Sequence, residues 1–315
     1  MTDWFVRRDF TEASEFLDAL SPHRMWGHRP DWWLFRGQGD ADWELKPSAF
    51  RKLPTFDYGR GPYAPKPTHR EQIVQEALLM RLFVSGINEQ GGELPSEAAF
   101  GLTNWREIDH IVEAAAPEEG PLPATVWPPP QLQQLFALAQ HHGLPTRLLD
   151  WTERGKVAAY FAAEAAQRMR DAGAHPAQIA VWAYAYVHDD AGDFWDGSDW
   201  RPEIVRVPRA RNPNLHAQGG VFTVVVNPRL RPGDASRIPS LDRLVAHRAA
   251  VVDAAPQHGP LLYQLRLESD RAGELLRLLR YEHISSTYLF PGYDGVIRGI
   301  TERRLWDRVT FPWDF

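Results

Sequence analysis

The sequence contains no cysteine, which excludes disulfide bonds, thiolate catalysis and cysteine-ligated zinc. It has no apolar run of the roughly 20 residues that a membrane-spanning helix needs. The N-terminal residues 1–8 carry charges where a secretion signal would need an apolar core. From these three absences we expect a cytoplasmic protein that has no membrane partner.

Several familiar catalytic motifs are lacking as well: the chain has no GxGxxG, Walker, HExxH or GxSxG motif. No histidine or carboxylate stands four residues from His141 or His142, so we expect no metal site. The formal net charge of −6 gives no general attraction to nucleic acid, and only a local basic patch, for instance around 201–211, would provide one.

The composition is otherwise that of an ordinary globular protein, with 43% hydrophobic and 24% charged residues among 315. Thirteen tryptophans are unusual, and an excess of aromatic residues suits a site that stacks a flat ligand. Helical and strand-like patterns both occur, and no repeat is present. We predict an α+β fold: a single mixed domain whose central sheet is flanked by helices and long loop insertions.

Capping residues before apolar stripes indicate helices, and short apolar or alternating runs indicate strands. The predicted helices begin at or after Thr11, the capping box 68–71, Gln131, Thr152, and Ser269 or Asp270. The predicted strands are 32–35, 179–187, 221–226 and 261–267, with a further short strand beside the turn 290–295.

Segments rich in proline, glycine or polar residues divide the chain. We expect an N-terminal helical segment (1–30), a main domain (31–300) and a C-terminal tail that packs on it (301–315). Within the main domain, the expected surface insertions are 51–67, 88–130 and 189–217.

Residues 140–152, Gln-His-His-Gly-Leu-Pro-Thr-Arg-Leu-Leu-Asp-Trp-Thr, concentrate hydrogen-bonding groups between an apolar helix and an apolar strand. This density indicates a site in which Asp150 contacts a ligand or orients Arg36. Alternatively, Asp150 stabilises the N-terminus of the next helix. For His141 and His142 a structural role at a helix end is favoured over catalysis.

Two further polar clusters adjoin predicted strands. Arg36 follows an apolar strand and carries a guanidinium suited to phosphate or carboxylate, while Gly37 would let a ligand approach the backbone. The alternative for Arg36 is a buried Arg–Asp pair. Gln218 precedes Gly219, Gly220 and another strand; it would be held at the mouth of that strand, although two glycines alone indicate only a tight turn.

Together, Phe35-Arg-Gly-Gln38, residues 140–152 and Ala158-Ala-Tyr-Phe-Ala162 resemble the FRG domain family, named for its Phe-Arg-Gly motif. Later elements also match, as Gln218-x-Gly220-x-Phe222-Thr223 and Leu289-Phe-Pro-x-x-Asp294-Gly295, so that the similarity runs from about residue 30 to 300. The chain departs at Gly155-Lys156, where the family tends to have Asn-Pro.

The order of these motifs is similar to that of ADP-ribosyltransferases, a likeness at the level of the fold. In that fold a first strand supplies Arg-Gly or His-Gly, a second supplies a Ser/Thr-rich segment before a helix, and a later strand begins with Gln-x-Glu or Glu. The likeness implies NAD as the substrate and Arg36, Asp150 and Gln218 as catalytic residues. The residues it implies for NAD binding are Arg36, Gly37, Gln38, His142, Thr146, Arg147, Thr152 and Thr223.

Gly220 departs from that pattern, because it stands where arginine-modifying transferases carry their catalytic glutamate. An active site would then need a carboxylate from Asp150, Asp294, Glu71 or Glu76.

The resemblance favours an ADP-ribosyltransferase-like enzyme that modifies a macromolecule or hydrolyses NAD, as a bacterial toxin or an anti-phage defence effector. Its partners would be a nucleotide ligand, a macromolecular acceptor and an immunity or antitoxin protein. Two alternatives are a non-catalytic module that senses nucleotides or nucleic acid, and a nuclease that uses His141 or His142 with Asp150.

Overall fold

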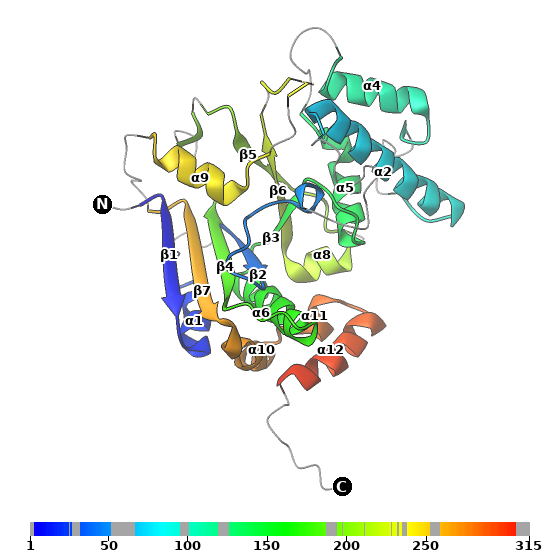
Figure 1. The fold of residues 1–315 in the computed structure, drawn as a ribbon. Coiled ribbons are helices and arrows are strands. Elements are labelled where there is room, and N and C mark those ends of the chain that lie inside the picture. The colour runs from blue at the N-terminus through cyan, green and yellow to red at the C-terminus, as the bar shows by residue number, and fades with distance from the viewer. Residues whose placement is uncertain are drawn as a thin grey trace.

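The fold is α+β, as predicted: a computed structural model shows one seven-stranded mixed sheet with helices around it (Figure 1). Most of the expected insertion 51–67 and the end of the C-terminal tail lie outside the described residues. The structure describes residues 3–24, 26, 32–51, 67–94, 101–118, 126–186, 194–196, 198–210, 212–227, 229–231, 233–234, 238–252 and 259–306.

The strands of the sheet are hydrogen-bonded in the order β1-β7-β4-β2-β3-β6-β5. β1 and β7 are parallel, and every other neighbouring pair is antiparallel. The predicted strands 32–35, 179–187, 221–226 and 261–267 correspond to β2, β4, β6 and β7, with small shifts at their ends. The strands are β1 (Phe5–Phe10), β2 (Trp33–Gln38), β3 (Leu149–Thr152), β4 (Gln178–Ala185), β5 (Arg201–Val205), β6 (Gly220–Val226) and β7 (Leu262–Glu268).

Helix α6 packs across β2, β3 and β4, and α10 packs against α6. Helices α2, α4 and α5 form a group beside β6, and α11 and α12 lie together near α6 (Figure 1). No helix in the described part of the chain has both the length and the apolar character needed to cross a bilayer. The helices are α1 (Ala13–Ala19), α2 (His69–Glu89), α4 (Trp105–Ala115), α5 (Pro130–His141), α6 (Gly155–Asp171), α8 (Pro213–Gln218), α9 (Leu241–Ala249), α10 (Ala272–Tyr281), α11 (Ser286–Leu289) and α12 (Tyr293–Trp306), with 3-10 turns at Ser48–Phe50 and Ser269–Arg271.

Three segments contain regular structure that the sequence patterns did not predict. The first 30 residues include β1 as well as a helix, and β1 pairs with β7 along its whole length. The insertion 189–217 includes β5 and α8, and the insertion 88–130 includes α4. In α4, Ile108 and Val112 stand four residues apart and are buried. Their helical spacing was obscured by the polar composition around them.

The short strand expected beside residues 290–295 is a helix instead. Residues from Tyr293 onward form α12, in which the apolar residues Tyr293, Ile297 and Ile300 recur with helical spacing. The β-branched residues favoured a strand, but helical spacing and packing against α11 decide the outcome.

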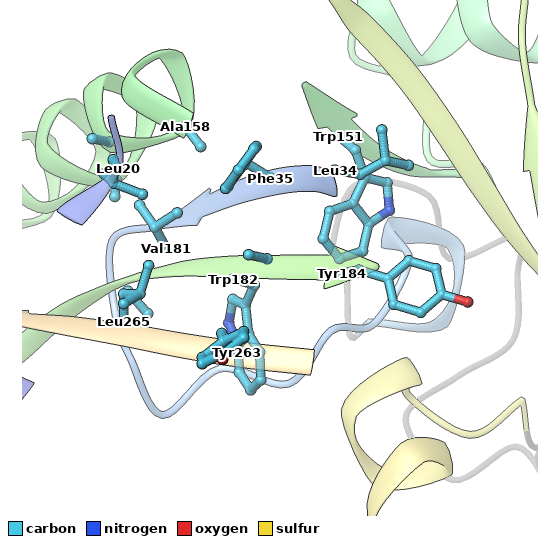
Figure 2. Packing of buried hydrophobic residues seen from close by; sticks show 14 of the residues in the cluster. Leu20, Leu34, Phe35, Trp151, Ala158, Val181, Trp182, Tyr184, Tyr263 and Leu265 are labelled. Carbon is cyan, nitrogen blue, oxygen red and sulfur yellow. The ribbon is translucent and has the colours of Figure 1, made fainter. Parts of the chain in front are cut away.

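The main core is formed by residues of the sheet and of helices α1, α6, α9 and α10. Figure 2 shows Phe35 and Val181 on the side of the sheet that faces α6, with Trp182 on the opposite side. A second core forms where α2, α4 and α5 pack against β6 and Leu148. The chain that enters β3 therefore passes between two cores.

Gly37 is required for the packing of α6 on β2. A Cβ atom on Gly37 would lie 1.9 Å from the carbonyl oxygen of Ala158 and 2.7 Å from the amide nitrogen of Ala162. Backbone atoms cannot give way as a flexible side chain can, so the helix itself occupies that space. We expected the missing Cβ of Gly37 to give a ligand access to the backbone. The space that a Cβ would occupy is instead filled by the backbone of α6.

His69, at the start of α2, gives a prediction about pH and stability. It is buried, and its Nδ1 atom has no hydrogen-bond partner among the described residues. Burial, with a smaller contribution from the charge of Arg147, lowers the pKa of His69 from 6.5 to about 4, although Asp234 opposes the shift. Between these two pH values the unfolded chain binds a proton that the folded chain does not.

Neutral His69 therefore contributes fully to the free energy of unfolding above pH 6.5. This contribution decreases by about 3 kcal/mol as the pH falls toward 4. We expect His69→Phe to reduce the pH dependence of the unfolding free energy, measured by urea denaturation between these pH values. The exposed His175 provides the control variant His175→Phe. An unchanged slope in His69→Phe would contradict the prediction.

Candidate functional site

A cavity of about 480 Å³ opens where β2 and β3 separate. Within these two described strands, one residue pair is in register, Phe35 with Thr152. Next to this pair, Arg36 and Gly37 on β2 and Asp150 on β3 line the cavity. Residues from α5, α6, α8 and the start of α12 complete the wall, so the site combines segments far apart in the sequence.

One carboxylate oxygen of Asp150 is bound by neighbouring side chains, and the other is accessible to a ligand. Arg36 donates from one terminal nitrogen to the Asp150 carbonyl at 2.8 Å and to its Oδ1 at 2.7 Å. Gln140 donates its amide to the same Oδ1 at 3.0 Å, and Thr146 in turn donates its hydroxyl to Gln140. The Asp150 side chain is 60% exposed, and within the described structure its Oδ2 accepts no hydrogen bond. This oxygen can therefore accept one from a ligand.

The charges around Asp150 favour an anionic ligand. Partial desolvation by the surrounding cavity opposes ionisation of Asp150, although its side chain is open to solvent, but the charge and hydrogen bond of Arg36, with help from Arg51, outweigh this effect and lower the pKa of Asp150. Burial and the charge of Arg36 also lower the pKa of Arg51, which Asp150 partly offsets. Two guanidinium groups and one carboxylate form a cluster of net charge +1. Arg51 was missed because it begins a segment that the sequence patterns assigned to a surface loop.

Aromatic rings line the cavity beside this cluster. Phe161 from α6 and Phe290, which precedes α12, meet edge to face with ring centroids 6.2 Å apart. The Arg298 guanidinium lies 4.5 Å from the centroid of the Phe290 ring. Such surfaces suit a flat heteroaromatic ring. Phe290 belongs to a motif noted in the sequence, whereas no sequence signal marked Arg298.

His141 and His142 both line the cavity. The Nε2 atom of His141 lies 2.8 Å from the side-chain nitrogen of Asn214. Burial, then the charges of His142 and Arg298, lower the pKa of His141, which keeps its ring neutral at pH 7. No group of three potential metal ligands occurs among the residues whose positions are described.

Six of the site residues expected from the sequence line this cavity, and the other four do not. The three expected catalytic residues are among the six, so the structure brings together segments up to about 180 residues apart. The six are Arg36, Gly37, His142, Asp150, Thr152 and Gln218; the four are Gln38, Thr146, Arg147 and Thr223.

Gln38 and Thr223 are buried in the sheet instead. Gln38 accepts a hydrogen bond from the Trp182 indole at 2.8 Å, and Thr223 accepts one from the Trp151 indole at 2.9 Å. Their neighbours Gly37 and Phe222 line the cavity. Because side chains alternate between the two faces of a strand, a shift of one residue removes them from the site.

Arg147 forms a buried ion pair rather than part of the cavity. Its Nε and one terminal nitrogen donate to the two carboxylate oxygens of Glu76 at 2.7 and 3.1 Å. The side chains of Arg147 and Glu76 are 3% and 2% exposed. Trp127 and Gln72 also donate to Glu76, so this carboxylate is not free to serve the cavity.

Thr146 and Glu71 have supporting roles too. Thr146 is buried and donates a hydrogen bond to Gln140, and Gln140 in turn donates one to Asp150. Glu71 accepts from the Thr68 amide at 2.7 Å and completes the capping box of α2, as the sequence predicted. Glu71 and Glu76 are therefore ruled out as the substitute carboxylate of the cavity.

Thr152 and Gln218 join β3, α8 and α11 at the edge of the cavity. The Thr152 hydroxyl donates to the Gln218 carbonyl at 2.6 Å, and the Gln218 amide donates to the Leu289 carbonyl at 3.1 Å. A Cβ atom on Gly220 would lie 2.2 Å from Cδ1 of Leu215, so a larger side chain would displace Leu215. Of the described residues that line the cavity, Asp150 and Asp294 are the carboxylates.

Comparison with known proteins agrees with the resemblance noted in the sequence. Residues 31–171 match the family model of the FRG domain. This span contains the Phe35-Arg-Gly-Gln38 motif and residues 140–152, and both segments contribute residues to the cavity. Searches of curated proteins and of solved structures found no match. The chain therefore contains an FRG domain over residues 31–171, and this domain contributes Arg36 and Asp150 to the polar cavity.

Proposed function

We propose that the cavity binds NAD, cleaves the bond between nicotinamide and ribose, and transfers ADP-ribose to a macromolecule or to water. The observation that carries this proposal is the convergence of Arg36, Asp150 and Gln218 on one cavity. The motifs that contribute these residues lie on β2, on β3 and directly before β6, and these three strands are neighbours. That arrangement supports the ADP-ribosyltransferase likeness derived from the motif order.

Several groups that line the cavity, together with the nearby Arg51, have roles in this reaction. Arg36 and Arg51 supply positive charge for the pyrophosphate, and the rings of Phe161 and Phe290 offer surfaces for nicotinamide or adenine. The open Oδ2 of Asp150 accepts a ribose hydroxyl. Arg36 and Gln140 hold this carboxylate in one orientation before the ligand arrives.

The chemistry requires negative charge near the ribose. When the glycosidic bond breaks, its electron pair leaves with nicotinamide and C1′ gains oxocarbenium character, which a carboxylate stabilises. Oxygen or nitrogen of the acceptor, or water, then bonds to C1′ and releases a proton to solvent. Asp150 and Asp294 are the groups that could supply the charge, since Gly220 carries no side chain.

The test is to incubate the purified protein with NAD and quantify nicotinamide by chromatography. We expect release by the wild type and a loss of about a hundredfold or more in Asp150→Asn, the range for removing a group that stabilises a transition state. The exposed Asp270, which pairs with Arg170, gives the control variant Asp270→Asn. Wild-type protein that releases no nicotinamide, with or without an acceptor extract, would refute the catalytic proposal.

A second candidate is a nucleotide-binding module without turnover. It is favoured by Gly220, which supplies no carboxylate at the position where the transferase pattern has its catalytic glutamate. Calorimetric binding of NAD without nicotinamide release would support this candidate. The nuclease alternative has less support, because the hydrogen bond found for His141 is with Asn214, not with Asp150.

A further inference from the structure

Exposed apolar side chains gather on one part of the molecule. Six of the ten large apolar residues that are exposed in the described structure lie between Tyr281 and Ile300. We call the group Tyr288, Tyr293, Val296, Ile297 and Ile300 the α12 surface; the last four are on α12 at helical spacing. A contiguous apolar area of this kind on a folded protein usually marks an interaction site.

The opposite face of α12 is the one that packs on the protein. A Cβ atom on Gly295 would lie 1.8 Å from the Phe290 carbonyl oxygen, so α12 contacts the backbone before it. Glu302, also on this face, is buried and accepts from the Ser286 amide at 3.0 Å. The helix thus buries glycine and a carboxylate and exposes its isoleucines. Monomer packing leaves that apolar stripe uncovered among the described residues.

The α12 surface lies beside the cavity. Asp294 and Arg298 line the cavity, and each is adjacent in sequence to a residue of the stripe. On its other side the stripe borders a groove of about 380 Å³, to which Val296 and Ile300 contribute with Arg280 and Arg303. A macromolecule that rests on the stripe would therefore lie close to the cavity.

The flanking charges indicate the chemistry of the partner. Arginines lie on both sides of the stripe: Arg298 on the cavity side, and Arg280 and Arg303 along the groove. Among the described acids close by, Glu302 is buried, Glu282 pairs with Lys156, and the exposed Asp294 is outnumbered by the three arginines. Tyrosine and arginine around an apolar centre are typical of protein interfaces. The net charge of −6 and the apolar centre argue against nucleic acid.

We propose that the α12 surface docks the protein that receives ADP-ribose, and that this acceptor presents apolar side chains bordered by carboxylates. The inference rests on the proposed function, because it assigns the acceptor class to the same cavity. The docked protein presents its nucleophile to C1′ at the cavity.

The experiment uses alkyne-tagged NAD and a soluble cell extract, with the full chain as enzyme. Ile297→Arg changes a side chain that is 62% exposed, so it should not disturb folding; the matched control is Leu82→Arg on α2, at 60% exposed. We expect Ile297→Arg to reduce protease-sensitive labelling at least about tenfold, equivalent to about 1.4 kcal/mol of docking energy. Nicotinamide release to water, measured without extract, should stay at the wild-type level in both variants.

The outcomes separate the two proposals. If wild-type protein releases no nicotinamide with or without extract, the proposed function fails. If it releases nicotinamide but Ile297→Arg labels proteins as well as wild type does, or if wild type labels none, only the docking inference is overturned. If nuclease treatment removes the label, the acceptor is a nucleic acid. If the wild type sediments as a dimer and Ile297→Arg as a monomer, a second copy of the chain occupies the surface. Each of these results also overturns it.

Discussion

Arg36→Ala is expected to weaken NAD binding and nicotinamide release by about a hundredfold or more. Arg36 donates to both the carbonyl and the carboxylate of Asp150, and its Nε is buried without a partner in the described structure. Removing the guanidinium takes positive charge from the pyrophosphate and leaves Asp150 facing an anionic ligand. Truncating one member of a hydrogen-bonded charge pair at a binding site costs roughly 2–5 kcal/mol, and each 1.4 kcal/mol is about tenfold.

Calorimetric titration with NAD and the chromatographic nicotinamide assay measure this effect. Arg168→Ala is a suitable control, because Arg168 is exposed and pairs within α6 with Glu164. Arg36→Lys keeps the charge but not the planar donor group, so it should recover part of the affinity if charge dominates. An Arg36→Ala protein that binds NAD normally but melts at a lower temperature would show that the Arg36–Asp150 pair is structural.

Arg147→Met is expected to lower the free energy of unfolding by about 3–5 kcal/mol, because it leaves Glu76 buried without its charge partner. The pair joins the segment before β3 to α2 across 71 positions of sequence. Trp127 and Gln72 continue to donate to Glu76, but neither carries a charge. Because Arg147 lies outside the cavity, the NAD affinity of the folded fraction should stay close to that of the wild type.

Urea denaturation followed by circular dichroism measures the stability, and titration below the transition measures the affinity. The double variant Arg147→Met with Glu76→Gln removes both charges and keeps an acceptor for Trp127, so it should regain much of the lost stability. A single Arg147→Met variant of normal stability and greatly reduced NAD affinity would restore the ligand-binding role that the family resemblance implied.

These predictions assign different tasks to neighbouring residues of one motif. Asp150 faces the cavity, Arg147 anchors the layer formed by α2, and Trp151 is buried in the core. The density of polar residues in 140–152 correctly indicated a special region, but density does not tell which side chain faces a ligand. The direction in which a side chain points depends on the register of its strand and on the elements that pack on each face of the sheet. Segments distant in the sequence set both.

Local physical signals in the sequence determined the elements with strong periodicity and the similarity to the FRG domain. The capping box at Thr68 starts α2, and the small alanine side chains of α6 allow this helix to pack closely against β2. The motif around Phe35 and residues 140–152 identified the FRG domain. Such signals act between residues that are close in the chain, so a single sequence displays them.

Only the tertiary structure decided which polar groups share the cavity. In the folded protein Gly37 contacts α6, and Arg147 pairs with Glu76. Arg51 lies near Asp150, and Arg298 lies over the ring of Phe290. Each of these relations joins residues brought together by the order of the strands and the packing of two helical layers. Burial energy is gained only when those layers meet, and that meeting, rather than any local pattern, selects the face that each side chain occupies.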